Sequence, residues 1–144
     1  MLNEQVATSR VDDEMTGHRW LAVEDEQVIG YLALVAGHGW SSHVGEVRLV
    51  IDPGRRRQGL GRQLARRGLV EALNLGLTKV IVEVAADQES TVGLFTGLGF
   101  EPEALLRDHI RDRSGMFRDL IVLSHSVPDM SSAMATLGID QALD

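Results

Sequence analysis

Residues 50–61 of this 144-residue chain read Val50-Ile-Asp-Pro-Gly-Arg-Arg-Arg-Gln-Gly-Leu-Gly61, and this stretch decides the fold. It joins a segment of alternating apolar and polar residues, 43–52, to an amphipathic segment, 59–76. Gly59 and Gly61 allow a backbone to approach a ligand closely. A helix that begins there directs unpaired N–H groups and its dipole outward. With three neighbouring arginines, the stretch predicts an anion site suited to a pyrophosphate.

This stretch matches neither of two other phosphate-binding motifs, because residues that those motifs require are missing. Gly54 and Gly59 have the spacing of a nucleotide P-loop, but Leu60 replaces its lysine and Gly61 its hydroxyl residue. A dinucleotide fingerprint needs a third glycine where this chain has Leu64. The alternative to an anion site is a glycine-rich turn that caps a helix beside solvated arginines.

Outward from this loop, hydrophobic periodicity predicts the other elements. Residues 1–17 are polar, with weak helical spacing at most, and a charged loop, 107–115, separates the last two expected strands. The expected strands are 19–24, 28–36, 43–52, 79–86, 100–109 and 116–126, and the expected helices are 59–76, 88–98 and 129–137.

The order of these elements predicts the topology. The strand–helix–strand unit over 43–86 requires a crossover and therefore a parallel strand pair, whereas the flanking hairpins are antiparallel. We therefore expect one mixed-sheet domain of the α/β or α+β class over residues 1–144.

Composition excludes several classes of function. The net charge of −7 disfavours a nucleic-acid binder. The absence of cysteine excludes disulfides, thiolate zinc sites and cysteine nucleophiles, and the five histidines have no metal-ligand spacing. No apolar run approaches the roughly 20 residues of a membrane span, and the N-terminus lacks a secretory signal. We expect a cytoplasmic protein with no membrane partner and no metal.

Three motifs in order resemble the GNAT acetyltransferase superfamily. Arg56-x-x-Gly59-x-Gly61 resembles the family's acyl-CoA pyrophosphate loop. The stretch 94–100, Leu-Phe-x-x-Leu-Gly-Phe, is similar to its second signature, and 118–123 to its closing strand. The resemblance covers about 19–126 and leaves 127–144 as a C-terminal extension.

The resemblance implies a fold and a cosubstrate. The sheet would be mixed, mostly antiparallel, flanked by helices and splayed between strands 43–52 and 79–86. Acetyl-CoA or another acyl-CoA would lie in the splay, and its acyl group would pass directly to a bound amine. The residues expected to bind it are Val50, Ile51, Arg56, Arg57, Gln58, Gly59, Leu60, Gly61, Arg62, Gln88 and Phe95.

A carboxylate on the acceptor side of strand 43–52 is the natural base for the incoming amine. Glu46 lies opposite the core residues of that strand, and its setting resembles the catalytic glutamate of protein-lysine acetyltransferases. The alternatives are a structural Glu46 paired with Arg48 or another arginine, or Glu83 on strand 79–86 as the base. Phe95 stands where the family has a tyrosine that protonates the leaving thiolate.

Residues 1–18 form a shorter front than the strand and two helices with which family domains usually begin. The acceptor side is therefore expected to be open to a large protein, or to be completed by a homodimer partner or the C-terminal segment. The leading prediction is an acyl-CoA-dependent N-acyltransferase that acetylates a primary amine. A non-catalytic acyl-CoA-binding regulatory module is the alternative, and a nucleotide-binding protein is a weaker one.

Overall fold

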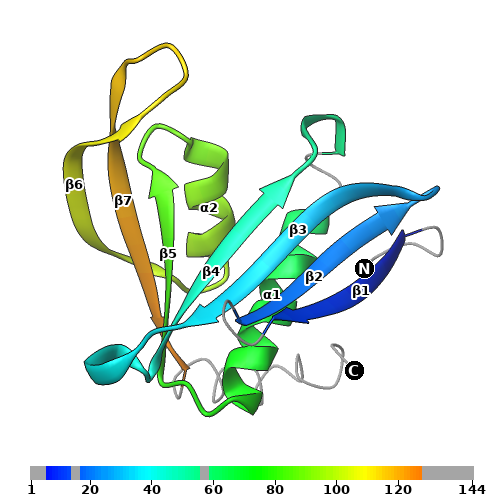
Figure 1. The fold of residues 1–144 in the computed structure, drawn as a ribbon. Coiled ribbons are helices and arrows are strands. Elements are labelled where there is room, and N and C mark those ends of the chain that lie inside the picture. Colours follow the sequence, from blue (N-terminus) through cyan, green and yellow to red (C-terminus); the bar gives the residue numbers. More distant parts are fainter. Residues whose placement is uncertain (1–5, 14–16, 56–58, 128–144) are drawn as a thin grey trace.

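The computed structural model describes residues 6–13, 17–55 and 59–127 (Figure 1). No helix in these ranges is long and apolar enough to cross a membrane. The elements are β1 (Val6–Asp13), β2 (Gly17–Glu24), β3 (Gln27–Ala36), η1 (Gly39–Ser41), β4 (Val44–Ile51), η2 (Pro53–Arg55), α1 (Leu60–Asn74), β5 (Lys79–Ala85), α2 (Glu89–Gly97), β6 (Glu101–Arg111) and β7 (Phe117–Ser126).

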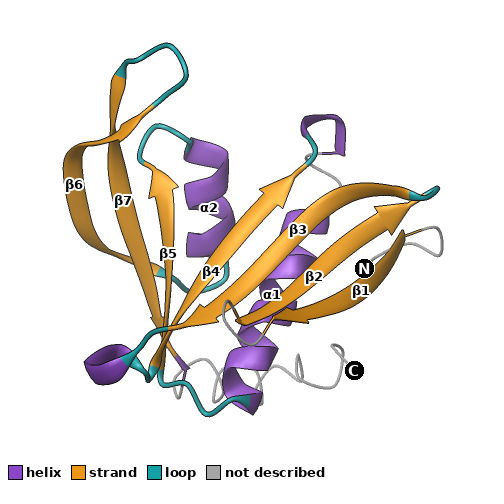
Figure 2. Ribbon diagram, in the orientation of Figure 1, coloured by secondary structure: helices purple, strands orange, loops and turns teal. Residues whose placement is uncertain are grey.

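The strands form one sheet in the order β1-β2-β3-β4-β5-β7-β6. Only β4 and β5 are parallel, and α1 is the crossover between them, because antiparallel neighbours join by hairpins and parallel ones do not. All other neighbouring strands are antiparallel. The predicted mixed sheet, mostly antiparallel, is confirmed (Figure 2).

The front of the chain corrects one expectation. Residues 6–13 form a strand, β1, which pairs with β2 along its whole length, from Val6 opposite Glu24 to Asp13 opposite Gly17. The sequence had indicated weak helical spacing at most. An edge strand takes its conformation from the partner that satisfies its main chain, so local spacing is a weak guide there. Because β1 is followed by β2 after residues 14–16, the two helices of the usual family front do not fit between them.

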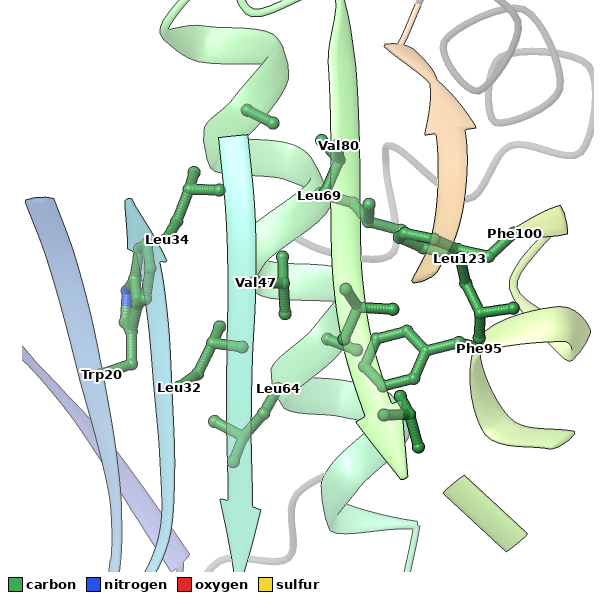
Figure 3. Packing of buried hydrophobic residues seen from close by; sticks show 14 of the residues in the cluster. Trp20, Leu32, Leu34, Val47, Leu64, Leu69, Val80, Phe95, Phe100 and Leu123 are labelled. Carbon is green, nitrogen blue, oxygen red and sulfur yellow. The ribbon is translucent and has the colours of Figure 1, made fainter. Parts of the chain in front are cut away.

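The core lies between α1 and one face of the sheet (Figure 3). On α1 the buried positions recur at helical spacing, as the sequence predicted. They face Leu32, Leu34 and Val47, which point to the same side from β3 and β4. The buried residues of α1 are Leu60, Leu64, Ala65, Gly68, Leu69 and Ala72.

The β6–β7 hairpin differs from the sequence expectation near its turn. Strand β6 continues to Arg111, well into the predicted charged loop 107–115, because a bulge between Leu106 and Ile110 places three residues of β6 opposite one residue of β7. A bulge of this kind leaves the extra residues unpaired and solvated, so polar residues are tolerated there. The predicted helix 129–137 lies outside the described residues.

Candidate functional site

The central feature is the divergence of β4 from β5. The parallel ladder runs from Val44 opposite Lys79 to Val47 opposite Val82 and stops there. Beyond it, β4 pairs only with β3, and β5 pairs only with β7. Figure 1 shows the two strands meeting at the lower end of the view and separating upward. We call the separated part, residues 48–51 and 83–85, the splay; the sequence resemblance had implied it.

One edge of β4 presents main-chain groups to the splay. The N–H of Asp52 donates to the carbonyl oxygen of Ile29 on β3 at 2.9 Å. Because alternate residues of a strand direct their N–H and C=O groups to opposite neighbours, Val50 also bonds towards β3. Leu49 and Ile51 direct theirs towards β5, which has already turned away.

This alternation distinguishes Val50 from Ile51, the two residues of β4 that were predicted to bind a cosubstrate. The main chain of Ile51 faces the splay, whereas that of Val50 faces β3 and its side chain is 63% exposed on the sheet face away from α1. Leu49 shares the direction of Ile51 and was not singled out from the sequence. The alternation along 43–52 could have identified Leu49, because residues two apart on a strand direct their main-chain groups to the same side.

The N-terminus of α1 supplies a set of amides that have no partner within the helix. Gly59 occupies the N-cap position with a φ of 76°, a left-handed conformation that favours glycine. The first helical bond runs from the N–H of Gln63 to the oxygen of Gly59 at 3.1 Å. The N–H groups of Leu60, Gly61 and Arg62 therefore have no acceptor within the helix. The helix has no side-chain cap and no acid in its first turn, so its positive end is not neutralised there.

The second glycine of the motif serves packing. A Cβ on Gly61 would lie 3.0 Å from Leu94 Cδ1 of α2 and 3.6 Å from Ile51 Cγ1 of β4. Glycine at this position therefore lets the start of α1 rest on both elements and places its amides beside the splay. Leu60 is only 4% exposed and belongs to the core, so its side chain is not available to a ligand. Arg56, Arg57 and Gln58 lie outside the described residues.

The second signature motif has a structural explanation in the way α2 ends. Gly99 has a φ of 100° and donates its N–H to Thr96, while the N–H of Phe100 reaches back to the oxygen of Phe95 at 3.0 Å. This is a Schellman motif, which typically brings together the side chains at the positions of Phe95 and Phe100. Their rings are in edge contact, with centroids 5.2 Å apart.

Phe95 is therefore part of the core. Its ring is 1% exposed and points from α2 towards β5 (Figure 3). In this conformation it presents almost no surface to a ligand, so its predicted contact with acyl-CoA stays a prediction. Gln88, by contrast, is exposed at the N-cap of α2. Its carbonyl accepts the N–H of Val92 at 3.0 Å, and its side chain makes no capping bond.

Glu46 lies at the inner end of the splay, on the sheet face away from α1. It stands opposite Ile81, one residue before the β4–β5 ladder ends. Its side chain is 25% exposed and accepts a hydrogen bond from Arg48 Nη2 at 3.2 Å. A contact with an arginine is what a structural Glu46 predicts, and it leaves the carboxylate partly exposed on the sheet face away from α1. Glu83 is exposed at the corresponding edge of β5.

The histidines form no site in the described chain. No group of three or more His, Asp or Glu side chains there is placed to hold a metal ion. His38 and His43 flank the fully exposed Trp40 in the loop before β4. That loop lies at the end where β4 and β5 are paired, since Val44 stands opposite Lys79.

Comparison with known families agrees with this geometry. The profile described as the Acetyltransferase (GNAT) family matches residues 3–100, more than half of the chain. The chain belongs to the GNAT acetyltransferase family. The match includes the start of α1, the splay and α2, and the sequence resemblance to this family is therefore confirmed.

Among its relatives, this GNAT chain is 35% identical over 88 residues to a mycothiol acetyltransferase of Catenulispora acidiphila. The match covers 60% of this chain and 25% of that protein, so the chain spans about a quarter of its relative's length. It is also 29% identical over 76 residues to the [ribosomal protein bS18]-alanine N-acetyltransferase of Escherichia coli, covering 53% of this chain and 51% of that enzyme.

A solved structure supports the fold of this GNAT chain. The protein yncA of Salmonella typhimurium, solved with its cofactor acetyl-CoA, superposes with a TM-score of 0.70 at 20% identity. The match covers 76% of this chain and 64% of that chain. At this identity the likeness establishes the arrangement of strands and helices, and the chemistry must be argued from the residues of this chain.

Proposed function

We propose that this protein is an acetyl-CoA-dependent N-acetyltransferase that acetylates a primary amine. The observation that carries the proposal is the position of the α1 amides beside the splay. The N–H groups of Leu60, Gly61 and Arg62 fit a pyrophosphate, because they are donors at the positive end of a helix. The main-chain groups of Leu49 and Ile51 fit the amide groups of a pantetheine arm.

The proposed reaction is direct transfer. The amine nitrogen attacks the thioester carbonyl carbon, a C–N bond forms, the C–S bond breaks, and CoA leaves as a thiolate. Glu46 takes the proton that the attacking ammonium must lose, directly or through one water. Phe95 has no proton to give, so the thiolate leaves unassisted or is protonated by water. A thiolate is a fair leaving group near neutral pH.

For the acceptor we propose a chemical class, a primary amine. The ribosomal-protein relative acts, by its name, on an alanine amine, which favours an amine of a protein or of a small molecule for this chain. We also propose a homodimer, since β2–β4 carry no described helix on the acceptor side. The predicted cytoplasmic location stays a prediction. Nothing in the comparisons favours the non-catalytic regulatory module.

Two measurements test the proposal. Calorimetry should show binding of acetyl-CoA and none of ATP or NAD. A screen of amine acceptors, read by release of free CoA, should then show turnover with at least one of them. Tight acetyl-CoA binding without turnover on any acceptor would favour the regulatory module, and binding of ATP alone would favour the nucleotide-binding alternative.

A further inference from the structure

Several contacts gather where β5 ends, at the open end of the splay. Arg118 of β7 donates Nε–H to Oδ2 of Asp87 at 3.0 Å, and its Nη2 bonds to the second oxygen of the same carboxylate. The N–H of Ala86 donates to the carbonyl oxygen of Asp119 at 2.9 Å. Oδ1 of Asp119 accepts the N–H of Asp108, in the β6 bulge, at 2.9 Å. The end of β5 is therefore tied to β7 and, through β7, to β6.

These ties matter because β5 lies between two possible partners. Leu49 and Ile51 of β4 have main-chain groups directed at β5 that β5 does not meet. Unpaired main-chain donors and acceptors favour any strand that can satisfy them. If the end of β5 moved towards β4, the parallel ladder would extend and the splay would close. The contacts to β7 oppose that movement.

We propose that the Arg118–Asp87 ion pair is a clamp that holds the end of β5 on β7 and thereby keeps the splay open for acyl-CoA. Both are positioning residues. By holding β5 on β7, they keep the main-chain groups of Leu49 and Ile51 on β4 free for a ligand. The proposal rests on the proposed function for its ligand. A bidentate Arg–carboxylate contact suits this role, since it fixes the relative orientation of the two side chains as well as their distance.

The chain contains a matched ion pair that should not act in this way. Lys79 Nζ lies 2.7 Å from Glu103 Oε1 and joins the start of β5 to β6. At that end β5 is already paired with β4, since Lys79 stands opposite Val44. Both pairs link β5, or the residues that follow it, to the β6–β7 hairpin, but only Arg118–Asp87 lies beside the splay.

The test compares acetyl-CoA binding by variants of the two pairs. Arg118→Gln and Asp87→Asn should each weaken acetyl-CoA affinity about two- to fivefold, the range expected of a surface ion pair. The KM for acetyl-CoA should rise with kcat unchanged. The charge swap, Asp87→Arg with Arg118→Asp, should restore most of the affinity. Lys79→Gln should leave affinity unchanged even if it lowers the thermal midpoint by a similar amount.

A second measurement needs no ligand. In the wild-type protein the amide hydrogens of Leu49 and Ile51 should exchange rapidly, since they have no strand partner on that side. In Arg118→Gln their exchange should slow, because β5 can then pair with β4. Unchanged exchange and affinity in this variant, or equal weakening by Lys79→Gln, would overturn the clamp. If wild-type protein binds no acetyl-CoA, the proposed function fails, and amide exchange alone decides the clamp.

Discussion

At the scale of single residues, Glu46 and Phe95 differ in how far a substrate can reach them. Glu46 is partly exposed on the acceptor face and held by Arg48. Phe95 is enclosed by the core at the end of α2. One residue is therefore accessible to an incoming amine, whereas the other would have to be uncovered before it could touch a substrate.

Replacing Glu46 with glutamine should lower kcat about 10²–10⁴-fold, the usual contribution of a positioned base. Acetyl-CoA affinity should stay nearly unchanged, because the side chain lies on the acceptor side of β4. Steady-state kinetics with an acceptor found in the screen measures both quantities. Glu83→Gln is the matched control and should retain turnover. Full activity of Glu46→Gln from about pH 6 to 9 would place the base elsewhere.

Phe95→Tyr should lower the free energy of unfolding by roughly 1–3 kcal/mol, since it places a hydroxyl in an apolar cluster. Its effect on the rate should be smaller than that of Glu46→Gln. Urea unfolding of the two proteins measures the difference in stability. Unchanged stability would mean that the new hydroxyl reaches water or the splay, where it could serve the leaving thiolate.

At the scale of elements, the contact of α1 with β4 and α2 positions the proposed anion site. The start of α1 approaches closely because Gly61 leaves room for Leu94 and Ile51. Gly59 has open space around its Cα but a positive φ. The two glycines of one motif therefore do different work: one permits packing and the other permits the turn into the helix.

Gly61→Val should weaken acetyl-CoA binding at least tenfold, about 1.4 kcal/mol. The branched side chain would push the start of α1 away from β4 and α2, and its amides away from the splay. Gly93→Ala is the control, because a Cβ there meets nothing within 4 Å. Calorimetry that gave Gly61→Val the wild-type affinity would remove the pyrophosphate assignment.

The clamp also predicts a pH dependence. Hydrogen bonding from the Arg118 guanidinium lowers the pKa of Asp87 below its ordinary value, although desolvation and, more weakly, the charge of Asp112 oppose the shift. Such a group stabilises the folded state above its unfolded pKa, and the contribution is lost as pH falls through the folded pKa. The difference in thermal midpoint between wild type and Asp87→Asn should be constant from about pH 8 to 5 and shrink below about pH 4. A difference that grew as the pH fell below about 4 would contradict this sign.

At the scale of the whole molecule, helices are unevenly distributed over the sheet. Among the described elements, α1 covers the core face of β3 and β4, and Figure 2 shows no helix on the opposite face of these strands. That face carries Glu46 and Arg48, with the exposed Val50 and the partly exposed Tyr31 beside them. An open face of this kind beside a site favours a partner.

We therefore predict a homodimer in which a second copy covers this face. Light scattering on the purified protein should give about twice the monomer mass of 15.8 kDa. Val50→Glu should shift the equilibrium towards monomer, because it places a charge within the proposed contact. Leu105→Glu is the control, at an equally exposed position on β6. A monomer whose open face is closed by its own chain would remove the reason for the prediction.

Sequence alone determined the order of strands and helices from residue 19 to 126 and the buried stripe of α1, because hydrophobic periodicity acts within a few residues. The anion loop that the glycine placement indicates stays a prediction. Tertiary structure decided the rest. It made 6–13 a strand through its pairing with β2, and it enclosed Phe95 in the core. It also directed Leu49 into the splay and joined Arg118 to Asp87. Each of these depends on which distant segment satisfies a main-chain or charged group, and local spacing does not contain that information.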